Sequence, residues 1–198
     1  MVFVVSFSFE VNAQEITAKE FINGKFIRFS TKGHPKSKEA SFTMKYPSTW
    51  MAQEGDRPNM VQRFISGNKN GVAFALISTK SIPIDEPLTQ NELQEVFSPE
   101  MLKKFVPDGG KFLNAKSTKI EGEPAGIVEY RLREERAGRG IDIQTLKLTF
   151  FQKRTLIFVS FSVAAPASSS GDLAKQYAAL YPLFFQMMNS IVFDDKYN

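Results

Sequence analysis

The chain has 198 residues, a formal net charge of +4 and a pI near 9.2, with nineteen phenylalanines, one histidine and no cysteine. The lack of cysteine excludes disulfides, thiol nucleophiles and thiolate metal sites, and a single histidine excludes metal sites built from several histidines. The length suits one domain with a phenylalanine-rich core, the mild basicity favours association with anionic surfaces, and no stretch approaches the ~20 apolar residues of a membrane-spanning helix.

The chain begins with an apolar, β-branched stretch over residues 1–13 and then becomes polar. The small residues of Val11-Asn12-Ala13 stand where a signal peptidase would cleave, which favours a signal-peptide remnant. The stretch has no basic start and carries Glu10 near its end, so a genuine first strand is the alternative. We expect 1–13 to be a signal remnant and 14–198 to be a single domain.

Two hairpins are expected in the first part of the domain. Asn23-Gly24 lies between Phe21-Ile22 and Phe26–Phe29, and it is a typical two-residue turn sequence. Ser41–Tyr46 alternates apolar and polar residues, as a strand with one buried face does, and Pro47 ends it. The second hairpin is predicted from two further apolar runs, Met60–Ile65 and Val72–Ser78.

Helices are expected in two places. Thr89-x-x-Glu92 is a capping box that predicts a helix start, and Ser98-Pro99 predicts that the helix restarts there. Near the end of the chain, apolar residues recur at helical spacing through Leu173–Ile191. Pro182 lies inside this pattern and removes one backbone hydrogen bond, so we expect a kink or a restart at that point.

A β-meander from Ile120 to Val163 organises the rest of the chain. In its second strand the apolar positions change phase, which indicates a β-bulge near Gln144–Thr145. The third strand is almost continuously apolar, which is typical of a central strand covered on both faces. Short links favour antiparallel pairing of the three strands, which are Gly126–Glu134, Ile141–Gln152 and Thr155–Ala164.

Four segments resemble the PsbP-like family, whose namesake is an extrinsic subunit of the photosynthetic oxygen-evolving complex. They are FTMKYPSTW, the turn Gly122–Ala125, LIFVSFSVAAP and the helix end Asn189–Phe193. The resemblance covers residues 26–193, and related domains include a nuclear Ran-GTPase release factor and DcrB-like periplasmic proteins. It implies an α+β fold, an α/β/α sandwich in which helices flank a central antiparallel sheet.

The same resemblance implies a non-enzymatic protein that acts by docking on a larger partner. Plant members of the family are associated with manganese or calcium handling, in part through histidines. The one histidine of this chain, His34, lies outside the matching motifs, so that role does not carry over. The acidic patch through which the nuclear member binds its partner has no counterpart cluster in this sequence.

Catalytic patterns in the sequence lack the context that their chemistry needs. Ser66-x-x-Lys69 has serine–lysine spacing, but it lies in a loop rather than at a helix start. Gly138-x-Gly140 lacks the third glycine of a dinucleotide fingerprint. The adjacent acids Glu134-Glu135 and Asp194-Asp195 are interpreted as solvated turn residues, since neighbours in a strand point to opposite faces. We therefore expect no catalytic residue, cofactor or metal site.

The polar group of most interest is Arg131 and Arg133 on a meander strand, with Lys147 expected on the next strand and Lys119 on the previous one. These residues are the predicted partner-binding site, a basic face for an anionic partner or a lipid headgroup. The alternative is a ladder of cross-strand charge pairs that stabilises the sheet by ~0.2–1 kcal/mol per pair. Both interpretations assume that this face is exposed to water.

The leading hypothesis is a non-catalytic, exported protein, periplasmic or lumenal, that serves as a binding or assembly module on a protein partner. The alternatives are a cytoplasmic, chaperone-like module of the same fold and a basic-face binder of an anionic lipid surface or ligand. An enzyme is the least favoured class, and no nucleic acid is expected as a partner because no aromatic residues are interleaved with the basic ones. Oligomeric state stays open at this point.

Overall fold

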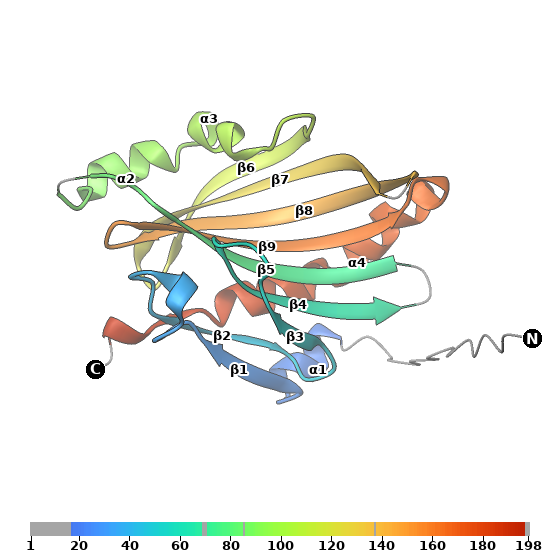
Figure 1. Cartoon of the computed structure of the whole chain (residues 1–198), viewed down its shortest axis with the longest axis horizontal. Helices are drawn as coiled ribbons and strands as arrows, with labels where there is room; N and C mark the ends of the chain where they lie inside the picture. The colour runs from blue at the N-terminus through green and yellow to red at the C-terminus, as the bar shows by residue number, and fades with distance from the viewer. Residues whose placement is uncertain (1–16, 69–70, 85, 137, 197–198) are drawn as a thin grey trace, which may run out of the picture.

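The computed structural model describes residues 17–68, 71–84, 86–136 and 138–196, so the expected signal remnant lies outside the described residues. Its strands form two antiparallel sheets (Figure 1). The small sheet has the order β1-β2-β10, made of β1 (Phe26–Ser30), β2 (Phe42–Pro47) and β10 (Val192–Phe193). The large sheet has the order β3-β4-β5-β9-β8-β7-β6, made of β3 (Met51–Glu54), β4 (Met60–Asn68), β5 (Gly71–Ser81), β6 (Lys111–Ile120), β7 (Glu123–Arg136), β8 (Arg139–Gln152) and β9 (Thr155–Pro166).

The helical segments of the described chain are short except for the last one. They are α1 (Ala18–Ile22), η1 (Pro35–Ser37), α2 (Gln90–Val96), α3 (Pro99–Leu102), η2 (Lys103–Phe105), η3 (Ala167–Ser169), α4 (Ser170–Asn189) and η4 (Asp194–Lys196). The predicted capping box begins α2, because the Glu92 backbone N–H donates to Thr89 Oγ1 and the Thr89 backbone N–H donates to Glu92 Oε2. The predicted restart at Ser98-Pro99 is confirmed by α3.

The large sheet is covered differently on its two faces. Its inner face packs against α4, α1 and the small sheet, and this layer holds the main core, in which Phe161 stacks on Phe184 at 5.7 Å between ring centroids. Its outer face carries a second, smaller core beneath α2, α3 and η2, around Leu102 and Val128. Figure 1 shows α4 running behind the strands and α2 and α3 along the β6 side. The predicted antiparallel α/β/α sandwich is confirmed.

Two local predictions are wrong for identifiable reasons. Asn23-Gly24 is not a hairpin turn, because a capping box between Thr17 and Glu20 starts helix α1, which buries Phe21. No register shift interrupts the pairing of β8 with β7 or β9, so there is no bulge at Gln144–Thr145. The apolar phase changes there because both faces of β8 are covered. Of the two outcomes expected at Pro182, a kink or a restart, the restart does not occur, because α4 is continuous from Ser170 to Asn189.

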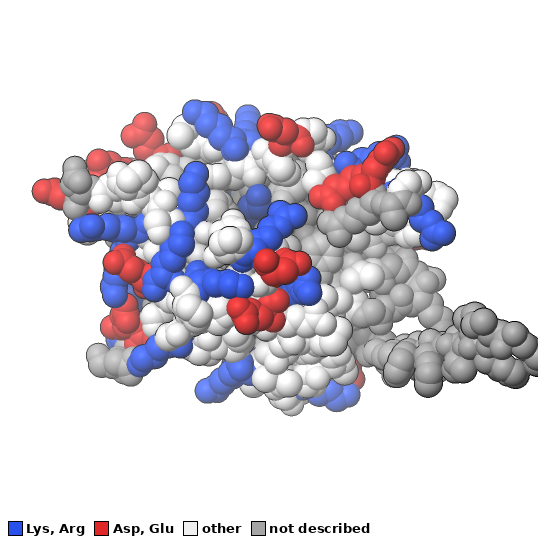
Figure 2. Space-filling model, in the orientation of Figure 1, with Lys and Arg blue, Asp and Glu red and all other residues white. Residues whose placement is uncertain are grey.

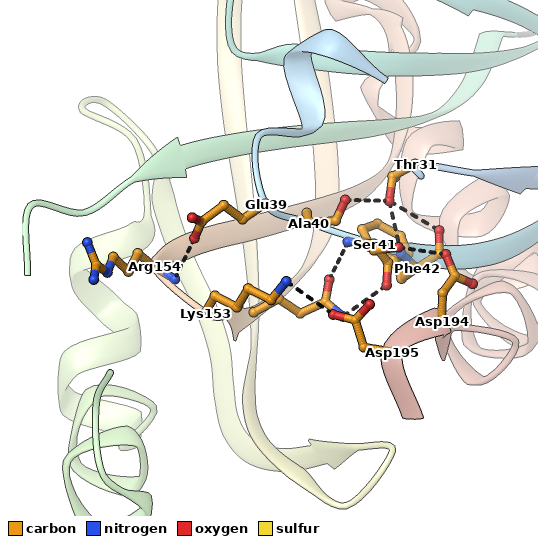
Figure 3. A network of polar contacts seen from close by, with 10 residues as sticks. Thr31, Glu39, Ala40, Ser41, Phe42, Lys153, Arg154, Asp194 and Asp195 are labelled. Carbon is orange, nitrogen blue, oxygen red and sulfur yellow. Dashed lines mark hydrogen bonds and ion pairs between the residues drawn. The ribbon is translucent and has the colours of Figure 1, made fainter. Parts of the chain in front are cut away.

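A side-chain clasp joins the two sheets (Figure 3). Gln152 at the end of β8 accepts from the backbone N–H of Ser41 at 2.9 Å and donates to the Ser41 carbonyl at 3.1 Å, so its amide acts as an extra peptide unit beside β2. Asp194 accepts hydrogen bonds from the Ser41 and Thr43 hydroxyls, each at 3.0 Å. Asp194 therefore anchors η4 to the small sheet. The prediction that Asp194 and Asp195 are both solvated turn residues fails for Asp194.

A substitution at Gly126 of β7 tests how closely helix α3 packs on the large sheet. A Cβ at this position would overlap the Leu102 side chain, so Gly126→Ala should lower the free energy of unfolding by about 1–3 kcal/mol. The double variant with Leu102→Ala should lose less than the sum of the two single variants, because the truncated side chain removes the clash. Urea denaturation measures both quantities.

The matched control is Gly171→Ala at the start of α4, where an added Cβ meets nothing within 4 Å. This variant should unfold at the same urea concentration as the wild type or at a higher one, since alanine is the better helix former. Equal stability of Gly126→Ala and the wild type would show that α3 does not pack tightly on β7.

Candidate functional site

A groove runs along β9 on the outer face of the large sheet, in the part that α2 and α3 leave uncovered. It has a volume of about 510 Å³. Its floor is low because β9 presents only small side chains there: Ser160, Ser162 and Ala164. Neighbouring strands present larger side chains that form its walls, including Phe74 on β5 and Ile143 on β8. We call this hollow the β9 groove.

The ladder registers define one closed end of the β9 groove. Ser160 lies between Leu76 of β5 and Lys147 of β8 in one row across the sheet. The next outward-facing residue of β9, Phe158, is large and packs against Phe105 of η2, with ring centroids 5.8 Å apart. The helical layer therefore closes the groove over β8 and β9 at the Ser160 row, while Met60 of β4 continues its lining past that row.

Lys147 is a half-buried cation at this end of the groove. Its Nζ donates to the Phe105 carbonyl at 2.9 Å and lies 4.9 Å from the ring centroid of Tyr130 and 5.7 Å from that of Phe158. Burial lowers the pKa of Lys147 to about 8. No Asp or Glu of the described ranges forms an ion pair with it, which is unusual because buried charges are normally paired.

The β9 groove is polar at its floor and charged at its rim. Thr145 and Ser162 face each other on neighbouring strands, with their hydroxyl oxygens 2.8 Å apart. Arg63 of β4 lies in the same row as Leu76 and lines the groove, and its Nε is buried without an acceptor among the described residues. Glu134 lines the groove beside Ile141, toward the opposite end from Ser160.

A second feature is the basic edge, defined here as Lys111, Lys116 and Lys119 on β6 with Lys103 and Lys104 of η2. β6 is an end strand of the large sheet, and the five lysines of this edge are exposed. Lys111 stands directly opposite Arg131 of β7, so two like charges face each other across the ladder. Arg131 hydrogen-bonds to the neutral Gln144 at 2.8 Å rather than to an acid.

The structure divides the predicted basic face. Arg131 and Arg133 lie on the inner face of β7, where Arg133 forms an ion pair with Asp142 at 2.7 Å. Lys147 lies on the outer face, since it pairs with Val128 rather than with an arginine. Lys119 is also on the outer side, at the far end of β6 opposite Pro124. Arg131 therefore joins the basic edge through Lys111, and Lys147 stands beside the β9 groove as the ladder partner of its lining residue Ser160.

The other candidate groups do not converge. Ser66 is buried in β4 and Lys69 lies outside the described residues. Glu134 faces the β9 groove, while Glu135 is exposed on the same strand. Across the described ranges, no three His, Asp or Glu side chains are grouped as metal ligands. Within the same ranges, no helix is long and apolar enough to cross a membrane.

Sequence reasoning missed the β9 groove because a hollow depends on side chains from several strands. A usable signal was present in β9, where outward positions change from Phe158 to the small residues Ser160, Ser162 and Ala164. A run of small residues on one face of an otherwise bulky central strand marks a place where something else can approach the sheet.

The burial of Lys147 predicts a pH dependence of stability. Its pKa is about 8 in the native protein against an ordinary 10.5, so the unfolded chain binds more protons between these values. The free energy of unfolding should therefore rise from about pH 8 to pH 10.5. Lys147→Met should lack this rise and should be at least as stable at neutral pH. Urea denaturation of both proteins across this range checks the sign, and a parallel pH profile would contradict it.

Comparison with known proteins identifies the fold. No protein-family model matches the chain, and no curated protein matches its sequence. The solution structure of cyanobacterial PsbP from Synechocystis sp. PCC 6803 is 17% identical, with a TM-score of 0.51 over 85% of this chain and 92% of that chain. The Ran-binding protein Mog1p of Saccharomyces cerevisiae is 7% identical, with a TM-score of 0.50 over 85% of this chain and 95% of that chain. The resemblance seen in the sequence motifs is thus confirmed at the level of structure, and the chain has the PsbP-like fold.

Proposed function

We propose that this chain is a non-catalytic, exported binding module that docks on a protein partner. The partner contributes an acidic, extended segment, which adds to the free side of β6 and extends the large sheet by one strand. The opposition of Lys111 and Arg131 carries the proposal. Like charges directly opposite each other destabilise a sheet, and such departures from local stability rules concentrate at functional positions.

The basic edge offers the two kinds of contact that strand addition uses. An end strand presents backbone N–H and C=O groups, which supply affinity without regard to sequence. The lysines of β6 and η2 then select an acidic partner, because opposite charges steer association and suppress wrong partners. Phe112 and Leu113, each 38% exposed, lie at a register shift of β6 and offer apolar contact. A peptide that alternates acidic and apolar residues matches all three features.

Lysines on an end strand also have a plain structural explanation, since they prevent aggregation between sheet edges. That explanation requires solvated lysines along β6 but gives no reason for an arginine opposite one of them on β7. Figure 2 shows anionic side chains interspersed with the cationic ones on the face in view. Against this mixed surface, the local excess of positive charge at the basic edge is a distinct feature. Mog1p, which shares the fold, is a Ran-binding protein, which supports a protein as the partner class.

The binding experiment uses a short peptide of alternating glutamate and valine as the probe. The wild-type protein should bind it, and hydrogen exchange should slow at alternate backbone amides of β6. The variant Lys111→Glu/Lys116→Glu should weaken binding about tenfold or more, because like charges would then face each other. Fluorescence anisotropy gives the affinities, and affinity capture from a native extract with the same variants then identifies the natural partner.

Two controls separate strand addition from general charge attraction. Lys19→Glu/Lys32→Glu changes the net charge equally at exposed positions away from β6, and it should bind the peptide as the wild type does. A proline-substituted version of the peptide cannot donate to the ladder and should bind weakly. Equal binding of both peptides without protection of β6 would replace this proposal with a charged-surface binder, such as one for anionic lipid.

Export is part of the proposal and is supported by the apolar stretch 1–13, with Val11-Asn12-Ala13 at its end. Expression of the full chain in its native host should yield a mature protein that begins at Gln14 in the envelope or lumenal fraction. Intact-mass spectrometry of the fractionated protein checks both points. A chain that retains residues 1–13 in the cytoplasmic fraction would instead support the cytoplasmic, chaperone-like alternative.

A further inference from the structure

We propose that the β9 groove binds a long-chain carboxylate, with the apolar chain along β9 and the carboxylate beside Lys147. This site is separate from the basic edge, because it lies on the open part of the outer face and the proposed strand addition occurs at β6. Its volume of about 510 Å³ falls within the range of about 300–1,000 Å³ that small-molecule pockets occupy.

The shape of the groove favours a linear molecule. Its floor follows one strand from Ser160 to Ala164, and the four residue-to-residue steps between them extend for about 13 Å. Apolar side chains on both sides, among them Phe74, Leu76 and Ile141, remain partly accessible to solvent because the floor between them is low. An alkyl chain lying over the small residues of β9 would remove this apolar surface from water, at about 25 cal/mol per Å².

The charge of the ligand follows from two cations in the row of Ser160: Arg63, which lines the groove, and Lys147, which stands beside Ser160. Lys147 is half-buried against the Tyr130 and Phe158 rings, with the Phe105 carbonyl as its acceptor. An ammonium has three N–H donors, so this group can donate further hydrogen bonds to a ligand oxygen. Arg63 reaches the same row of the sheet from β4 and has a buried Nε without an acceptor in the described chain. A carboxylate would satisfy donors that the protein leaves unused.

The orientation of the ligand follows from the distribution of charge along the groove. Lys147 stands beside Ser160 at one end of the groove, whereas Glu134 lines the groove beside Ile141 at the other end. The carboxylate therefore lies at the Ser160 end and the alkyl chain points toward Ala164. Asp56 also lines the groove, and it pairs with Arg63 Nη1 at 3.4 Å, so its charge is offset there, while Arg63 Nε has no acceptor among the described residues.

The probe is decanoate, compared with decanol and with decyltrimethylammonium, and binding is measured by isothermal titration calorimetry on the full chain. Wild-type protein should bind decanoate more tightly than decanol and should not bind the cation. Lys147→Met should weaken decanoate binding about tenfold or more, as the loss of a charge-assisted hydrogen bond predicts, and should leave decanol binding unchanged. Because the pKa of Lys147 is about 8, the preference for decanoate over decanol should fall as the pH rises above that value.

Three further variants make the result specific to the groove. Lys80→Met makes the same substitution at an exposed lysine on the same face of β5, outside the groove, and should bind decanoate like the wild type. Arg63→Gln should weaken decanoate binding selectively. Ala164→Phe fills the floor and should abolish binding of both decanoate and decanol, with circular dichroism confirming that the variant is folded.

The outcomes distinguish this site from the proposed docking edge. Lys111→Glu/Lys116→Glu should still bind decanoate, whether or not it binds the acidic peptide. Equal affinity of the wild type for decanoate and decanol, or equal loss of both in Lys147→Met, would overturn the assignment of the carboxylate to Lys147. Absence of decanoate binding by the wild type, or retained binding in a folded Ala164→Phe variant, would overturn the β9 groove as the site.

Discussion

The burial of β8 and β9 on both faces is the constraint on which the rest of the structure depends. Their inner faces are sealed by α4, through contacts such as Phe161 on Phe184. Their outer faces need a second cover, and the short helices α2 and α3 with η2 extend over only one side of the sheet. Where this cover ends, β9 carries the small residues Ser160, Ser162 and Ala164 between larger side chains of β5 and β8, and this difference in size creates the β9 groove.

Both proposed sites lie where the helical cover of the outer face ends. At the limit of η2, the Phe105 carbonyl holds the Lys147 ammonium in an apolar environment, which is unfavourable for a charge without a partner. At the free side of the sheet, β6 and β7 place Lys111 opposite Arg131. Both arrangements lower the stability of the isolated chain. A negatively charged binding partner would offset this loss of stability in each case. A protein with marginal stability retains such costs only at a few positions.

Much of the fold could be predicted from local patterns. The meander strands, the capping box at Thr89 and the restart at Ser98-Pro99 follow from backbone and capping chemistry that acts within a few residues. The incorrect predictions also come from local patterns. Asn23-Gly24 is a good turn sequence, yet the capping box at Thr17 stabilises a helix there instead, and the apolar phase change in β8 reflects a second covered face rather than a bulge.

The candidate site was less predictable because it depends on registers between distant strands. Sequence alone places Lys147 and Arg131 among the basic residues of the meander, but only the pairing of β7 with β8 separates them onto opposite faces. A shift of one residue would exchange the two faces. Arg63 and Lys147 are brought to one row by three successive ladders, which no local pattern encodes.

The position of β2 between β1 and β10 has a consequence for biosynthesis. One neighbour of β2 is made early, while the other, Val192–Phe193, is translated near the end of the described chain and is held in place by Asp194. A nascent chain emerging from the ribosome can form β1 and β2 long before this last neighbour exists. The small sheet therefore closes only after residues 192–193 have left the ribosome, and until then one side of β2 is open to chaperones.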